Sequence, residues 1–177
     1  MKIINTNFKD LKVVEGQKFL DNRGYFREIN KEKLFRKTDF IFWCMSKSKK
    51  YVLRGLHLQV NKEQDKFISV IKGKILDVVV DVRKKSKTFG KYYKIELSDK
   101  NCKSLFIPRG FAHGFVGLES ENIIIYGNSN YRSQKDEVGL MWNDKDFAIK
   151  WPKKKLIISK KDKKNISFKD FKDKFCN

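Results

Sequence analysis

Short apolar runs separated by glycine, proline or charged turns fill the middle of the chain. The clearest run, Lys74 to Asp81, is rich in β-branched residues and follows Gly73. Further runs that predict strands are Lys66–Val70, Tyr92–Leu97, Leu105–Ile107, Phe111–Leu118 and Asn122–Tyr126. They recur about every 8–12 residues with no long helical pattern between them, which predicts an all-β sandwich or barrel. We expect one domain over residues 1–177.

The two ends of the chain are less regular. The first fifty or so residues also look β-rich, and the polar segment Lys31–Arg36 predicts one helical turn. Near the C-terminus, Ser167–Phe171 predicts either a short helix or an extended arm.

The charge of the chain is strongly positive, at +20, with 41 basic residues. Such a charge suggests an anionic partner, whether nucleic acid, a membrane or a phosphorylated metabolite. Only seven of the basic residues are arginine, the usual reader of bases, and the lysines are interspersed with acids. We therefore favour ordinary surface composition over nucleic-acid binding.

Cysteines and apolar stretches set the remaining limits. Three widely spaced cysteines argue against both a disulfide framework and a zinc finger. No run approaches the ~18 apolar residues of a membrane span, and no apolar leader follows Met1. We expect a cytoplasmic protein without a membrane partner.

The two histidines, His57 and His113, are too few for the several-histidine set of a metal-dependent barrel, so we expect no metal and no cofactor. On a regular strand Arg54 and His57 would face opposite sides. A twist or a bulge near Gly55 would bring both toward one pocket. Taken alone, His57 fits a hydrogen-bonded core histidine slightly better than a catalytic one.

Other segments combine turn residues with chemical groups. The run Asp21–Glu28 begins as a turn and becomes alternating; its arginines suit phosphates and Phe26 offers an aromatic face, but an exposed hairpin is the default interpretation. In Pro108–Phe115, glycines flank a histidine, so that backbone can approach a ligand closely. Tyr126 is either a general acid or a packing residue.

Together, in this order, these segments resemble the dTDP-4-dehydrorhamnose 3,5-epimerases, the RmlC-like cupins, over nearly the whole chain. The matching segments are Asp21–Phe26, Ser46–Ser48, Val52–Gln59, Gln64–Lys66, Val80–Arg83, Thr88–Gly90, Pro108–Phe115, Tyr126, Trp142–Asp144 and Ser159–Asp162. No single segment is specific, but the ordered set is.

The resemblance implies a cupin-type jelly-roll β-sandwich with short C-terminal helical or extended segments. It also implies a homodimer, metal-free chemistry and a nucleotide-linked 4-keto-6-deoxy sugar as substrate. By resemblance, His57 is the base, Asp162 the carboxylate that orients it, Tyr126 the acid and Lys66 the active-site lysine. The phosphate and sugar contacts of the family fall on Arg23, Glu28, Arg54 and His113.

Three positions depart from the family where it binds the nucleobase. Phe42 and Cys44 replace Gln and Asn, and Arg132 replaces a tyrosine that stacks on thymine. We therefore expect a nucleobase other than thymine, with GDP-linked 4-keto-6-deoxy-heptose as the leading candidate and Arg132 contacting guanine. The alternative is that Arg132 faces solvent and a dTDP-hexose still binds.

The reaction also leaves alternatives open. The family resemblance allows inversion at C3 and at C5, whereas some relatives invert C3 alone. A 3,4-ketoisomerase on a similar sugar nucleotide is a further possibility. The alternative from another class is a non-catalytic cupin that binds an anion or nucleic acid, as the charge of +20 suggests.

Overall fold

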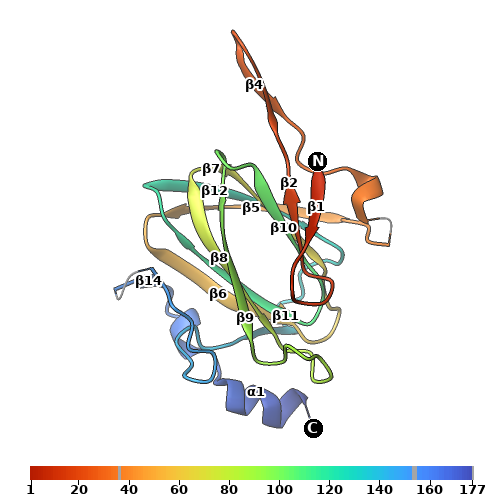
Figure 1. The fold of residues 1–177 in the computed structure, drawn as a ribbon. Helices are drawn as coiled ribbons and strands as arrows, with labels where there is room; N and C mark the ends of the chain where they lie inside the picture. Colours follow the sequence, from red (N-terminus) through yellow and green to blue (C-terminus); the bar gives the residue numbers. More distant parts are fainter. Residues whose placement is uncertain (36, 153–154, 177) are drawn as a thin grey trace.

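Two β-sheets face one another in the computed structural model, which describes residues 1–35, 37–152 and 155–176 (Figure 1). The first sheet has six antiparallel strands in the order β1-β2-β10-β7-β12-β5. These strands are β1 (Lys2–Asn5), β2 (Lys12–Glu15), β10 (Lys103–Ile107), β7 (Lys66–Lys72), β12 (Glu121–Asn128) and β5 (Phe42–Lys49).

The second sheet follows the order β13-β6-β11-β8-β9, with β14 parallel to β6. Its strands are β13 (Glu137–Gly139), β6 (Val52–Gln59), β11 (Phe111–Gly117), β8 (Lys74–Asp81), β9 (Tyr92–Ser98) and β14 (Ile157–Ile158). Strands far apart in sequence are therefore neighbours in both sheets, as in a jelly roll, and the predicted all-β cupin-type fold is confirmed.

Each predicted strand of the middle region is present, and its ends shift by no more than two residues. The predicted turn near Lys31 is the 3-10 helix η1 (Glu32–Phe35); Arg36, its last predicted residue, lies outside the described residues. Of the two alternatives at the C-terminus, the structure has the helix, α1 (Phe168–Phe175), which Ser167 caps by accepting from the Asp170 amide.

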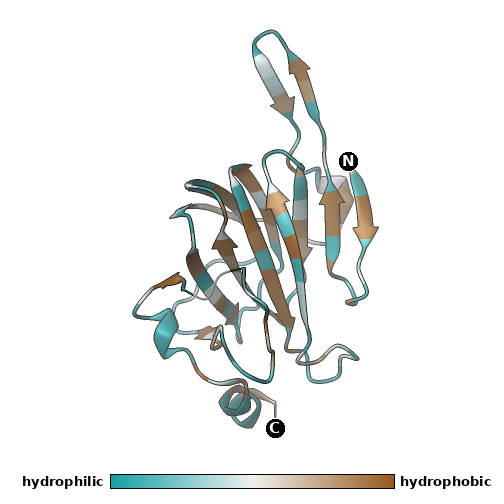
Figure 2. Cartoon of the chain, turned by 60° about the vertical axis from the view of Figure 1, so that its left-hand side comes forward, coloured by the Kyte–Doolittle hydropathy of each residue, from teal (hydrophilic) through white to brown (hydrophobic). Residues whose placement is uncertain are grey.

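Two large clusters of buried apolar side chains lie on the two faces of the second sheet. One cluster lies between the sheets and includes Ile68, Val79 and Phe115. A second covers the outer face of the second sheet, where Phe168 and Phe171 of α1 pack on the strands. The C-terminal region thus packs on the outer face of this sheet, and Figure 2 shows its helix at the opposite end of the molecule from the protruding N-terminal hairpin. Within the described residues, no helix is long and apolar enough to cross a membrane.

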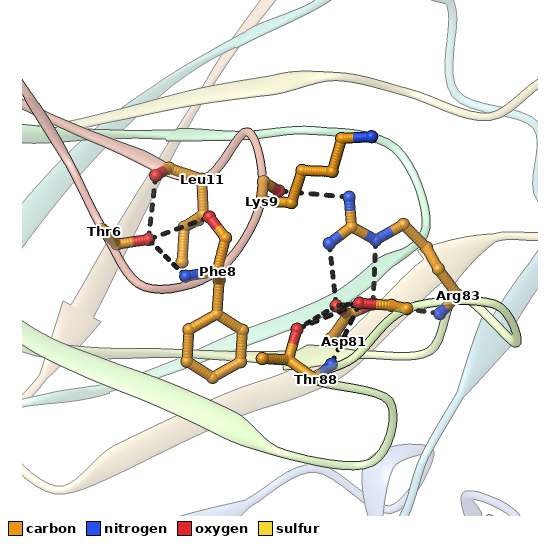
Figure 3. A network of polar contacts seen from close by, with 8 residues as sticks. Thr6, Phe8, Lys9, Leu11, Asp81, Arg83 and Thr88 are labelled. Carbon is orange, nitrogen blue, oxygen red and sulfur yellow. Dashed lines mark hydrogen bonds and ion pairs between the residues drawn. The ribbon is translucent and has the colours of Figure 1, made fainter.

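Asp81, at the end of β8, organises a polar network that fixes the next turn (Figure 3). The Asp81 carboxylate is fully buried and accepts from the Arg83 guanidinium at 2.7 and 2.9 Å and from the Thr88 hydroxyl at 2.6 Å. Arg83 also donates to the Lys9 carbonyl at 3.2 Å, which ties this turn to the N-terminal loop. Paired and hydrogen-bonded in this way, the buried carboxylate stabilises the fold.

A hairpin stands away from both sheets (Figure 1). It consists of β3 (Lys18–Asp21) and β4 (Gly24–Arg27), which pair only with each other. Its apolar side chains are exposed, among them Leu20 at 80% and Phe26 at 66%. An isolated two-stranded hairpin is only marginally stable in water, and exposed apolar side chains of this kind typically mark a surface that contacts another molecule.

Candidate active site

One cavity of about 760 Å³ opens between the two sheets. Seven of the ten residues predicted for the site line it: Arg54, His57, Lys66, His113, Tyr126, Arg132 and Asp162. They come from both walls, since β6 and β11 belong to the second sheet and β7 and β12 to the first.

An irregularity in β6 places two of these side chains together. Arg54 lies opposite Phe115 and His57 opposite His113, so two residues of β6 face the single residue Gly114 of β11. This is the predicted bulge. Gly55 within it has φ +123°, and a side chain there would meet the Gly114 Cα at 2.5 Å. The bulge therefore gives Arg54 and His57 access to the same cavity.

His57 is held by a buried carboxylate. Its Nε2 lies 2.8 Å from Oδ1 of Asp162, whose side chain is 6% exposed. A carboxylate only accepts, so Nε2 carries the hydrogen and Nδ1 keeps its lone pair. Burial alone would raise the pKa of Asp162, but the hydrogen bond from His57, together with those from the Gly55 amide and the Ser159 hydroxyl, outweighs burial and holds this pKa below its ordinary value. The pair is thus an ionised carboxylate orienting an imidazole that can accept a proton.

Tyr126 lines the opposite wall. Its hydroxyl lies 2.7 Å from the Ser46 hydroxyl on β5, and burial raises its pKa well above the ordinary value. The phenol therefore keeps its proton at neutral pH and is available as a donor. A base on one sheet and an acid on the other can act on opposite faces of a ligand carbon.

Three further polar side chains line the same cavity: Lys66, His113 and Arg54. Burial lowers the pKa of the Lys66 ammonium. His113 is 6% exposed and its Nε2 lies 2.8 Å from Oδ2 of Asp77. Asp77 is fully buried and burial raises its pKa. Arg54 is oriented by the Ser48 hydroxyl at 2.9 Å. The Lys66 ammonium and the Arg54 guanidinium can stabilise negative charge that develops on a bound ligand.

The other three predicted contacts do not reach this cavity within one chain. Arg23 and Phe26 lie on the protruding hairpin, where Arg23 pairs with Asp21 at 2.6 Å. Glu28 follows the hairpin and pairs with Lys31. None of them lines the cavity of its own chain.

Several polar groups of the site are not among the residues predicted from the sequence. Asp77 had a signal, because a carboxylate within the apolar strand Lys74–Asp81 must have a buried partner. Ser46 and Glu137 had none, since their partners come from other strands. Arg132, expected either to contact a base or to face solvent, lines the cavity and donates from Nε to Glu137 at 3.1 Å.

This arrangement suits an epimerase, an isomerase that removes a proton from one face of a carbon and returns one to the opposite face. Comparison with known proteins gives the particular kind. The chain belongs to the dTDP-4-dehydrorhamnose 3,5-epimerase family, whose pattern it matches over residues 5–170.

Individual relatives are similar along almost their whole length. The dTDP-4-dehydrorhamnose 3,5-epimerase of Shigella flexneri is 40% identical over 176 residues, covering 96% of this chain and 97% of the relative. The Bacillus anthracis enzyme, solved with TDP and PPi bound, is 40% identical with a TM-score of 0.90, covering 94% and 99% of the two chains. The Legionella pneumophila enzyme, solved with dTDP-4-keto-L-rhamnose, is 36% identical with a TM-score of 0.87, covering 91% and 89%.

Proposed function

We propose that this protein inverts C3, C5 or both in a 4-keto-6-deoxy sugar linked to a nucleoside diphosphate. The observation that carries the proposal is the opposition of two groups in one cavity: His57, on the second sheet and paired with Asp162, and Tyr126 on the first sheet. The family and the nucleotide ligands of its solved relatives support the substrate class.

The chemistry follows from the acidity of carbons beside a ketone. His57 takes the proton from C3 or C5 through Nδ1, and the C–H electron pair moves into an enolate on the C4 oxygen. Asp162 stabilises the imidazolium that forms. Lys66 stabilises the enolate oxygen. Tyr126 then gives its proton to the opposite face of the carbon as the ketone reforms, and the centre is inverted.

Exchange with solvent deuterium tests this proposal. We expect the protein to exchange the C3 proton, the C5 proton or both of a 4-keto-6-deoxy sugar nucleotide, followed by NMR. The variant His57→Asn should lose about 10²–10⁴-fold of this rate while still binding nucleotide. Exchange at neither carbon would refute the proposal. Exchange and inversion at C3 alone, or a 3-keto product, would instead identify the monoepimerase or the 3,4-ketoisomerase.

Binding without catalysis is the alternative from another class. A non-catalytic cupin would bind its anionic ligand equally well with and without the His57→Asn change. Affinity for random DNA at physiological ionic strength, falling steeply with salt, would favour a nucleic-acid partner. We expect no such affinity.

The nucleobase distinguishes two candidates for the substrate. The relatives solved with ligand hold thymidine nucleotides, which makes a dTDP-hexose the first candidate. Phe42, Cys44 and Arg132 favour GDP as the second, because the guanidinium lines the cavity and suits the paired acceptors of guanine. Calorimetric titration with dTDP and GDP decides between them, and equally tight binding of both would refute discrimination by this end of the cavity.

A homodimer completes the proposal. The exposed apolar side chains of the hairpin, Phe19, Leu20, Tyr25 and Phe26, need a covering surface. The same hairpin carries Arg23, a predicted substrate contact that its own cavity lacks. We infer that a second copy covers the hairpin and receives Arg23 at its cavity.

Sedimentation equilibrium tests the dimer. It should give twice the chain mass of 21.0 kDa. The change Leu20→Asp should weaken both association and turnover together. A fully active monomer would refute the dimer while leaving the proposed reaction intact.

A further inference from the structure

Glu137 is the second carboxylate of the cavity and joins two cations there. Oε2 accepts from Nε of Arg132 at 3.1 Å, and Oε1 binds Nζ of Lys161. The Glu137 side chain is 13% exposed, whereas those of its two partners are 60% and 57% exposed. All three side chains line the cavity. A nearly buried carboxylate thus holds two more exposed cationic side chains.

The ionised state of Glu137 follows from these contacts. Burial alone would raise its pKa, but the hydrogen bonds from Lys161 and Arg132 outweigh burial and hold the pKa below its ordinary value. Negative charge in a cavity for an anionic ligand opposes binding. Glu137 therefore needs a compensating role, and orienting its two cations supplies one.

The contact between Glu137 and Arg132 bears on ligand recognition. Glu137 accepts from Nε, and within the part of the chain that the structure describes the Nη1 and Nη2 groups of Arg132 donate to no other residue. A guanidinium fixed through Nε presents this outer edge in a defined direction, which suits a planar pair of acceptors on a phosphate or a base. Orientation before binding lowers the entropy cost of that contact.

The contact between Glu137 and Lys161 bears on the His57–Asp162 pair. Lys161 immediately precedes Asp162, which opens the 3-10 turn η2 (Asp162–Lys164). Glu137 lies on β13, whose Gly139 is paired with His57 on β6. The Lys161–Glu137 ion pair therefore ties the turn that carries Asp162 to the sheet that carries His57.

We propose that Glu137 is a positioning residue with two separable effects. Through Arg132 it orients a guanidinium for the nucleoside diphosphate of the substrate, and through Lys161 it holds Asp162 in register with His57. The inference rests on the proposed epimerase function and adds a residue that couples nucleotide binding to the catalytic pair.

Three variants separate the two contacts: Glu137→Gln, Arg132→Gln and Lys161→Met. Arg132→Gln should raise KM and the Kd of the product nucleotide roughly tenfold and leave kcat nearly unchanged, since charged hydrogen bonds are worth about that factor or more. Lys161→Met should lower kcat roughly tenfold with a small change in Kd. Glu137→Gln should do both, and adding Arg132→Gln to it should raise Kd little further.

Glu121→Gln is the matched control. Glu121 also joins two lysines, Lys47 and Lys72, but it does not line the cavity. Loss of this bridge should leave kcat, KM and nucleotide Kd within about twofold of the parent values, because exposed ion pairs contribute little.

A readout independent of turnover separates this inference from the proposed function. The downfield Nε2–H proton resonance of the His57–Asp162 pair should broaden or shift in Glu137→Gln and Lys161→Met, and stay in place in Arg132→Gln and Glu121→Gln. Unchanged resonances together with unchanged nucleotide Kd would overturn the role of Glu137, whether or not the parent protein turns over. Parent protein that exchanges neither C3 nor C5 protons would refute the reaction, while the resonance and Kd would still decide on Glu137.

Discussion

Replacing Asp162 by asparagine tests the central pair with no change of shape. The two oxygens of the carboxylate face different donors: Oδ1 accepts from His57 Nε2 at 2.8 Å, and Oδ2 accepts from the Gly55 amide at 3.4 Å. An amide has one accepting oxygen and one donating nitrogen. The substituted side chain can therefore satisfy one of these donors and must present N–H groups to the other.

Each choice has a cost that can be estimated. If the amide nitrogen faces His57, it favours the tautomer whose Nδ1 carries the hydrogen, and the imidazole can no longer accept a proton from substrate. By analogy with the triad of serine proteases, in which the same change selects the wrong tautomer, kcat should fall roughly 10³–10⁴-fold. That fall corresponds to about 4–5 kcal/mol of transition-state stabilisation. If the amide nitrogen instead faces Gly55, the Gly55 N–H loses its acceptor. A buried donor without an acceptor costs about 1–3 kcal/mol of stability.

The assay combines deuterium exchange at C3 and C5 with urea unfolding. We expect Asp162→Asn to lose at least about a hundredfold in exchange rate, because even the favourable orientation removes the charge that stabilises the imidazolium. Nucleotide Kd should stay within a few-fold of the parent value. A variant that folds, binds nucleotide and exchanges within about threefold of the parent rate would refute the role of this carboxylate.

Three further changes test the scaffold and the acid. Gly55→Ala should cost at least about 3 kcal/mol in chemical denaturation, because φ is +123° and the new Cβ would meet Gly114 Cα at 2.5 Å. Tyr126→Phe should keep exchange at the carbon that His57 deprotonates but lose inversion in product analysis; normal inversion would contradict its role as acid. Burial alone would raise the pKa of Asp81, but hydrogen bonds from Arg83, Ser86 and Thr88 outweigh burial and lower this pKa. The stability that Asp81 contributes is therefore present above its unfolded-state pKa and is lost as pH falls through its folded-state pKa. Arg83→Met should thus move acid unfolding, followed by circular dichroism, to higher pH; an unchanged midpoint would contradict this linkage.

The strands of the middle region were predictable because each is a local apolar run. Burial on both faces makes β8 almost continuously apolar, and its bounds, Lys74–Asp81, match the prediction. The ends were harder. Ser167–Phe171 left helix and arm open, since the packing of Phe168 on Phe147, with ring centroids 4.6 Å apart, brings together residues 21 positions apart. Tertiary contact of that kind overrides local propensity.

The site was predictable in part for the same reason. The bulge at Gly55 could be inferred, because regular alternation would separate Arg54 from His57. The positioning partners of the site could not. Asp162 enters from a turn 105 residues after His57, and Ser46 reaches Tyr126 across 80 residues. Only the family resemblance assigned Asp162, and nothing local indicated that Ser46 or Glu137 would lie in the cavity.

The net charge of +20 of the whole chain and the net charge of the cavity lining affect ligand binding in different ways. Among the described residues the cavity is lined by four cationic side chains, Arg54, Lys66, Arg132 and Lys161, and by two carboxylates, Asp162 and Glu137. Glu137 offsets part of the charge of its two partners, and Asp162 is committed to His57. Arg54, by contrast, donates to neutral groups, the Ser48 hydroxyl and the Lys47 carbonyl, so no carboxylate offsets its charge.

The cavity therefore carries a surplus of two positive charges, four cations against two carboxylates. This surplus is of the same size as the negative charge of a diphosphate. The many surface lysines lie in high dielectric and are screened by salt within about 10 Å. They raise the encounter rate with anions of any kind but cannot distinguish among them. Selection for a sugar nucleotide thus depends on where a few cations are fixed, and Glu137 is the group that fixes two of them.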